Sequence, residues 1–113
     1  MEARATAKYL RSTARKARLV ADAVRGQSVS NALVRLEHGS NKKVAEDIAK
    51  VLKSAVANLQ NKNLEANVNV DELRIKEIRV DEGPTMKRFR ARAQGRAYGI
   101  LKRMCHVSVT VTS

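Results

Sequence analysis

The stretch LRIKEIRVDEGP, residues 73–84, decides the fold class, because here the hydrophobic pattern changes from a helical period to a period of two. Leu73 and Ile75 fall on one face of an extended strand, whereas Ile78 and Val80 are out of phase with them. One additional residue around Lys76–Glu77 would bring all four apolar side chains to one buried face, as a β-bulge does. We therefore predict a strand with a bulge near its middle.

A second strand is predicted at HVSVTV, residues 106–111, where apolar and polar side chains alternate without interruption. The two strands flank a basic segment, and the order strand, connection, strand is typical of a β-hairpin. Pairing Val80 with Val107 and Ile78 with Val109 keeps the apolar side chains of both strands on one face.

The segment between these strands, at about residues 84–103, is predicted to be a protruding β-hairpin, called the arm below. Continuing the same register outward places Phe89 opposite Tyr98, and two opposed aromatic residues are a favourable cross-strand pair. The turn then falls within Arg92–Gly95, with Gly95 as a suitable turn residue. Legs of about ten residues would reach roughly 30 Å beyond the rest of the protein.

The first ten residues predict one more strand. Weak alternation over residues 3–10 places Ala3, Ala5, Ala7 and Tyr9 on one side.

Three helices are predicted to follow. Ser12 can cap the first, which runs to Arg25 and ends at Gly26. Ser28 or Ser30 opens the second, which ends at Gly39. Asn41 caps the third and clearest helix, whose apolar positions are Val44, Ala45, Ile48, Val51, Leu52, Ala55, Val56 and Leu59.

These elements predict an α+β fold: three helices packed on one face of a small three-stranded antiparallel sheet, with the long arm protruding. A length of 113 residues favours a single domain. Only three aromatic residues are present, so the core must consist of Ala, Val, Leu and Ile.

The net charge of +12 is concentrated at the two ends of the sequence. Residues 1–26 hold seven Lys or Arg against two acids, and residues 83–113 hold seven against none. Residues 27–82 balance at nine against nine. Charge needed only for solubility would be spread more evenly, so this distribution indicates a binding surface assembled from two segments.

The partner predicted from this charge is a nucleic acid, because each phosphate that a cation neutralises releases counterions and lowers the free energy. Five of the seven cations in residues 86–103 are arginines, which fork onto phosphate oxygens and stack on bases. Phe89 and Tyr98 either stack on splayed bases or only stabilise the hairpin. The arginines of the first helix are expected to point to the nucleic acid rather than to acids of the domain. The candidate nucleic-acid-binding residues are Lys8, Arg11, Arg15, Lys16, Arg18, Arg25, Lys87, Arg88, Phe89, Arg90, Arg92, Arg96, Tyr98, Lys102 and Arg103.

The sequence offers no set of catalytic or metal-binding residues. Its adjacent acids point apart on a helix or strand, and no nucleophile has a base at a recognisable spacing. His106 and Cys105 would face opposite sides of a strand, which disfavours a metal site. We expect no enzyme, no cofactor and no metal.

The single cysteine and the absence of a long apolar run predict a cytoplasmic protein without a membrane segment or a secretory signal. We expect no homo-oligomer.

Four stretches together resemble the bacterial form of the ribosomal large-subunit protein twenty-two family. They are RSTARKARLVADAVRG (11–26), KVLKSAVANLQNK (50–62), VDEGPTMKRFRARAQGRA (80–97) and LKRMCHVSV (101–109), in that order along the chain. The resemblance implies a structural constituent of the large ribosomal subunit that binds large-subunit ribosomal RNA through a basic face. Its globular part would lie near the exit of the polypeptide tunnel and its hairpin would line the tunnel.

The resemblance also implies that the arm cations contact ribosomal RNA, beside neighbouring ribosomal proteins. The tip, residues Arg92, Ala93, Gln94, Gly95 and Arg96, would face the tunnel, where members of this family meet the nascent polypeptide and influence macrolide action. Two departures are Ala91 and the pair Thr13–Ala14, where the family often has proline; neither removes a charge.

Two further readings differ in class. A DNA-bending architectural protein would place a β-arm in the minor groove, but such arms usually carry an apolar wedge at the tip, and Arg92–Gly95 offers none. An enzyme acting on RNA would need a catalytic set that the chain lacks.

Overall fold

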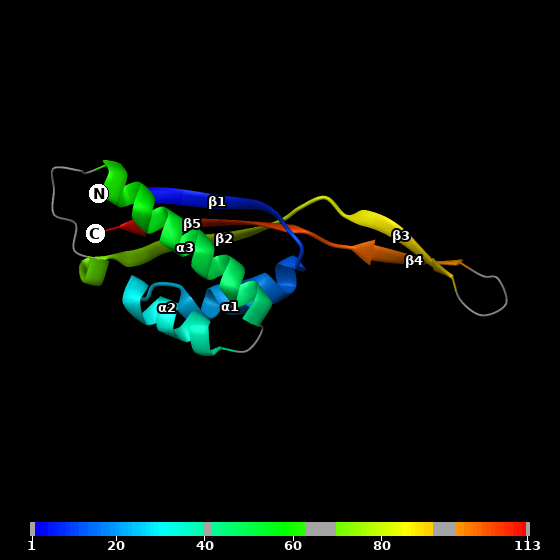
Figure 1. Ribbon diagram of the computed structural model, residues 1–113, viewed down its shortest axis with the longest axis horizontal. Helices are drawn as coiled ribbons and strands as arrows, with labels where there is room; N and C mark the ends of the chain where they lie inside the picture. The colour runs from blue at the N-terminus through cyan, green and yellow to red at the C-terminus, as the bar shows by residue number, and fades with distance from the viewer. Residues whose placement is uncertain (1, 40–41, 63–69, 92–96, 113) are drawn as a thin grey trace.

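The structure is a computed structural model that describes residues 2–39, 42–62, 70–91 and 97–112. In chain order the elements are β1 (Glu2–Leu10), α1 (Ala14–Val24), α2 (Val29–His38), α3 (Lys42–Lys62), a 3-10 turn (Val70–Glu72), β2 (Arg74–Glu82), β3 (Met86–Ala91), β4 (Ala97–Lys102) and β5 (Cys105–Thr112). The three helices cover one face of an antiparallel sheet of order β1-β5-β2, and β3 pairs with β4 in a two-stranded ribbon that projects from one end (Figure 1). The predicted α+β fold is confirmed.

The central strand β5 is aligned with β2 as the sequence predicts. Val80 pairs with Val107 and Ile78 with Val109, and the register shifts between Ile75 and Glu77. This shift is the predicted bulge. It places the apolar side chains from both halves of β2 on the helix-facing side of the sheet.

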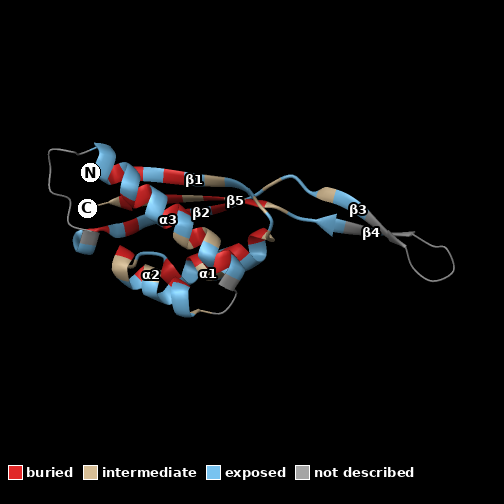
Figure 2. Ribbon diagram, viewed as in Figure 1, coloured by how far each residue is buried: buried red, intermediate tan, exposed pale blue. Residues whose placement is uncertain are grey.

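The core lies between α3 and the sheet, where α3 packs against β1 and β5 while α1 packs against β2. All eight apolar positions predicted for α3 are buried. Among the described residues, the buried side chains are only Ala, Val, Leu, Ile and Cys105, as the scarcity of aromatic residues requires. Buried positions fill the inner faces of the sheet and helices but are absent from the described part of the arm (Figure 2).

The ends of the first two helices follow local sequence signals. Thr13, one residue later than predicted, caps α1 through its hydroxyl, which accepts from the N–H of Lys16. Gly26 ends α1 with a φ of +76°, a conformation that favours glycine. Ser28 rather than Ser30 caps α2, and Gly39 ends it. The cap predicted at Asn41 lies outside the described residues.

The register predicted for the arm is wrong by one residue. Phe89 pairs with Gly99, and Arg90 pairs with Tyr98. The Gly83 N–H still donates to the Met104 carbonyl at 2.9 Å, so the change falls between Gly83 and Met86. Pro84 stands there and has no N–H to donate, so it interrupts the ladder and leaves room for one extra residue. The predicted turn at residues 92–95 lies outside the described residues.

A second irregularity corrects the prediction for β1. Ala3 and Ala5 are buried as expected, but Tyr9 is 59% exposed instead of sharing their face. The register with β5 shifts between Ala7 and Leu10, and Tyr9 adopts a φ of +60°. One extra residue in β1 therefore turns the tyrosine away from the core.

Cys105 opens β5 at the arm end of the sheet and is fully buried. Burial, with a smaller effect of the Asp47 carboxylate, raises the pKa of its thiol above the ordinary value of 9.0.

The raised pKa predicts a loss of stability at alkaline pH. Below pH 9 the thiol is protonated in both the folded and the unfolded chain, so its contribution to the free energy of unfolding is fully present. Above pH 9 the unfolded chain releases the thiol proton first. The contribution is then lost as pH rises toward the folded pKa, by up to about 1.4 kcal/mol per pH unit. In urea denaturation between pH 8 and pH 10, Cys105→Val should lose less stability than the parent. Parallel loss in both proteins would contradict the prediction.

Candidate RNA-binding surface

The described part of the arm exposes its cations. Lys87 and Arg88 on β3 are exposed, as are Lys102 at the end of β4 and Arg103 just after it. The Arg88 guanidinium donates to the Lys87 carbonyl at 3.0 Å, and no acid lies in the arm to neutralise any of these charges. The side chains of Phe89, Arg90 and Tyr98, and the whole of residues 92–96 with Arg92 and Arg96, lie outside the description.

Two candidate arginines, one on α1 and one directly after it, contact the protein itself. Arg18 donates through Nε (3.3 Å) and Nη2 (3.1 Å) to the Val80 carbonyl, and Arg25 donates through Nη2 to the Ile78 carbonyl at 3.0 Å. Both acceptors lie on β2, an edge strand whose outer carbonyls need partners. Arg25 also forms an ion pair with Asp22, so the expectation that it avoids acids of the domain is wrong.

The start of α1 differs from its later turns. Arg15 and Lys16 are exposed in the first turn, which contains no acid, and Arg11 is exposed just before it. Cations near a helix N-terminus are unfavourable beside the helix dipole unless an anion lies close by. These three residues therefore fit a binding role better than Arg18 and Arg25 do.

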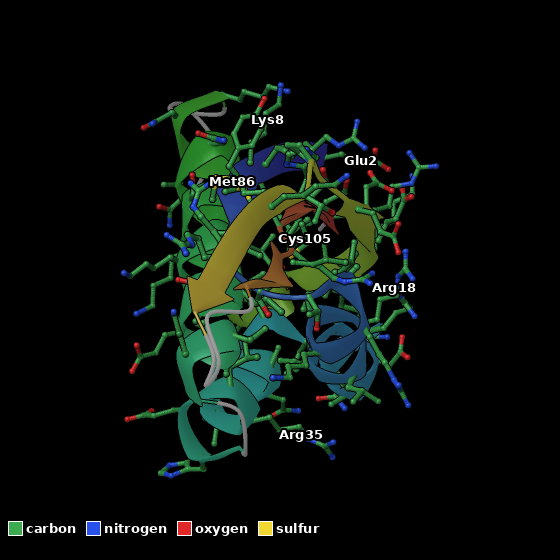
Figure 3. All side chains as sticks on the ribbon, turned by 90° about the vertical axis from the view of Figure 1, so that its right-hand side faces the viewer. Glu2, Lys8, Arg18, Arg35, Met86 and Cys105 are labelled. Atoms are coloured by element: carbon green, nitrogen blue, oxygen red, sulfur yellow. The ribbon has the colours of Figure 1, made fainter. Side chains whose placement is uncertain are left out.

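A groove of about 850 Å³ lies at the base of the arm, where β1 passes into α1 and where α3 begins. We call it the basic groove, because its walls carry five cations and a single carboxylate. Its charged lining residues are Arg11, Lys16, Lys43, Lys102, Arg103 and Asp47. In the view along the arm, Met86 marks the base of the arm, and Lys8 and Arg18 lie on different sides of that base (Figure 3).

The basic groove joins the two charged segments that the sequence separates by residues 27–82. Lys43 also lines the groove. The sequence analysis did not single it out, because residues 27–82, in which it lies, have no net charge. The absence of any acid from the first turn of α3 is the one local signal that could have drawn attention to Lys43.

Substitutions of Arg15 and Arg18 should separate binding from stability. Arg18→Gln loses its bonds to the edge of β2 and is expected to lower the free energy of unfolding by about 1 kcal/mol. Arg15→Gln should leave that free energy within about 0.5 kcal/mol and reduce the salt dependence of RNA binding by about one phosphate contact. Urea denaturation and salt titration of RNA binding measure the two effects. Equal destabilisation, or an unchanged salt slope for Arg15→Gln, would contradict this division.

Within the described residues, no group of three or more His, Cys, Asp or Glu side chains could hold a metal ion. None of the described helices is both long enough and apolar enough to span a membrane.

The fold and the groove define a class of protein: a small α+β protein with a basic groove and a basic two-stranded β-ribbon. Residues 5–112 match the family model described as ribosomal protein L22p/L17e. The chain belongs to this family. It is therefore a structural ribosomal protein and not an enzyme, and the family sets aside the DNA-bending alternative.

Relatives of similar length support the same family. The chain is 51% identical over 111 residues to the large ribosomal subunit protein uL22 of Clostridium novyi (strain NT), covering 98% of this chain and 96% of the relative. It is 53% identical over 110 residues to the protein of that name from Syntrophus aciditrophicus (strain SB), with 96% of each chain covered. With the Mycoplasma capricolum protein it shares 50% identity over 112 residues, 99% of this chain and 97% of the relative.

Proposed function

We propose that residues 1–113 act as a single RNA-binding unit of the large ribosomal subunit, which binds large-subunit ribosomal RNA through the basic groove and the arm. The observation that carries this proposal is the basic groove, where cations from three separate segments surround one carboxylate. Packing holds five like charges together beside one carboxylate, so the free protein bears a repulsion that an anionic partner relieves.

Phosphate is the anion that suits this arrangement best. Arg11, Lys16 and Lys43 line the groove from the start of α1 and of α3, and Lys102 with Arg103 lines it from the base of the arm. A nucleic-acid backbone that enters the groove can therefore continue along the exposed cations of β3 and β4. Contacts of this kind make the affinity strongly dependent on salt.

We further propose that the arm lines the polypeptide exit tunnel and that residues 92–96 face the nascent polypeptide, with neighbouring ribosomal proteins beside the globular part. The support is the family together with the shape, because the molecule measures 66 × 25 × 15 Å and the arm is a thin ribbon of two strands. Such a ribbon can pass between RNA segments that would exclude a globular element. The site of action would be the cytoplasmic ribosome.

Binding assays with the full chain test the first part of the proposal. Large-subunit ribosomal RNA should bind more tightly than duplex DNA of similar length, with a steep loss of affinity as salt rises. The protein should also co-sediment with large ribosomal subunits after a moderate salt wash. Equal affinity for both nucleic acids, or release from the subunits by that wash, would contradict RNA recognition.

Photo-crosslinking tests the second part. A photoreactive amino acid at position 94, in ribosomes stalled on a nascent chain, should crosslink to that chain. The same group at position 53, an exposed residue of α3, should not. Crosslinking from both positions or from neither would contradict a tunnel-facing tip.

A further inference from the structure

Tyr9 is an aromatic side chain that the core does not use. The chain has only three aromatic residues, and this one is 59% exposed. It lines the basic groove together with Arg11, Lys16 and Lys43. An exposed tyrosine bordered by cations combines a flat apolar surface with phosphate-binding groups.

The backbone holds Tyr9 in an uncommon conformation. Its φ of +60° is the only positive φ of a non-glycine residue in the described part of the chain. Bulky side chains rarely adopt this region, and such outliers persist where the surrounding structure fixes them. The bulge in β1 is thus retained although it exposes the ring instead of burying it.

His106 supplies the fixing contacts. The Tyr9 N–H donates to His106 Nδ1 at 3.0 Å, and the two rings meet edge to face with centroids 4.9 Å apart and planes at 89°. On its other side the imidazole is confined by Gly83, where an added Cβ would come within 3.3 Å of it. Whichever ring presents its edge, the imidazole leaves at least one face of the tyrosine uncovered.

We propose that Tyr9 is a stacking platform for an unpaired nucleotide of the RNA, whose phosphates are held by the cations of the basic groove. This inference rests on the proposed function and adds the kind of nucleotide that the groove selects. Bases inside a duplex are stacked on each other and cannot reach the ring, whereas splayed bases of single-stranded or junction RNA can.

Fluorescence offers a direct test, because the chain has two tyrosines and no tryptophan. In a Tyr98→Phe variant, Tyr9 is the only tyrosine and gives all the tyrosine emission, and its contacts with His106 are kept. The two probes are a single-stranded octanucleotide RNA and a duplex RNA of equal length, with correction for absorption by the RNA. The octanucleotide should quench the emission at saturation and the duplex should not. Unchanged emission at saturation with the octanucleotide, or equal quenching by both, would overturn the proposal.

Affinity gives a second readout. Tyr9→Leu keeps an unbranched-Cβ residue at the positive φ but removes the aromatic face, and should weaken binding of the octanucleotide by about five-fold or more. Tyr9→Phe should bind within about two-fold of the parent, because it still stacks. Unchanged affinity of a folded Tyr9→Leu variant, or an equal loss toward duplex RNA, would overturn the platform. If the parent protein itself binds neither RNA, the proposed function fails instead.

Lys43 provides the matched charge test. Lys43→Gln should reduce the salt slope of octanucleotide binding by about 0.7, the value for one phosphate contact of a single strand. Lys53→Gln, on the same helix but lining a different hollow beside α2, should leave the slope unchanged. Equal slopes for the two variants would show that the groove does not hold the phosphates.

Discussion

Replacing Met86–Arg103 by Asn-Gly is expected to leave the protein folded while removing most of its affinity for ribosomal RNA at moderate salt. The described arm residues contribute no buried side chain, and the arm brings seven cations without an acid. Gly83 and Met104 remain bonded in the shortened protein. Pro84 and Thr85 then join with Asn-Gly in a four-residue connection, a length that hairpins accept.

The loss of binding follows from counterion release. If all seven arm cations contact phosphate, the slope of log affinity against log salt should shrink by up to about five, at about 0.7 for each contact. Some binding should remain, because Arg11, Lys16 and Lys43 stay in the groove. The measurements are thermal unfolding of the free variant and salt titrations of RNA binding.

A full-length control separates the charge of the arm from its length. Lys87, Arg88, Lys102 and Arg103 are replaced together by Gln, which should remove about four contacts' worth of salt dependence while the hairpin stays intact. A shortened protein that unfolds would show that the arm belongs to the core. One that folds and binds as tightly as the parent would show that the arm does not serve RNA binding.

Leu52→Ala is expected to destabilise the protein by about 2–5 kcal/mol, the usual cost of emptying a buried leucine site. Leu52 lies on the inner side of α3 and is 1% exposed. Small domains have total stabilities of about 5–15 kcal/mol, so this loss is a large fraction of the whole. The core holds no described aromatic side chain that could shift to fill the cavity.

Leu101→Ala is the matched control, because it removes the same atoms from a residue of the arm that is 51% exposed. Its free energy of unfolding should change by no more than about 0.5 kcal/mol. Urea denaturation at one pH measures both variants. A comparable loss in the two would mean that the arm packs on the domain in solution.

The secondary structure was largely predictable because its signals are local. The helical spacing of apolar residues from Val44 to Leu59 specifies α3, and every one of those side chains is buried. Gly26 and Gly39 end the first two helices as predicted. Even the bulge in β2 could be inferred, because a strand that must bury one face cannot tolerate a change of phase without an extra residue.

The errors of the sequence analysis occur where strand register is interrupted. The aromatic pairing of Phe89 with Tyr98 assumed an unbroken ladder from β2 into the arm, whereas the register changes by one residue next to Pro84. Likewise, regular alternation placed Tyr9 with Ala3 and Ala5, but a bulge turns it outward. An extra residue changes the face of everything beyond it, and a pattern of alternation does not reveal which strand accommodates it.

The sequence by itself determined the class of fold, the hydrophobic face of each helix and the excess of charge at both ends of the chain. Each of these depends on residues within a few positions of one another. Only the tertiary structure decided which cations lie together. It assigns Arg18 and Arg25 to carbonyls on the edge of β2, and it brings Lys43 to the groove beside Arg11 and Lys102. The physical reason is that a side chain's partners are set by how helices and strands distant in sequence pack together, and summed charge carries no information about that packing.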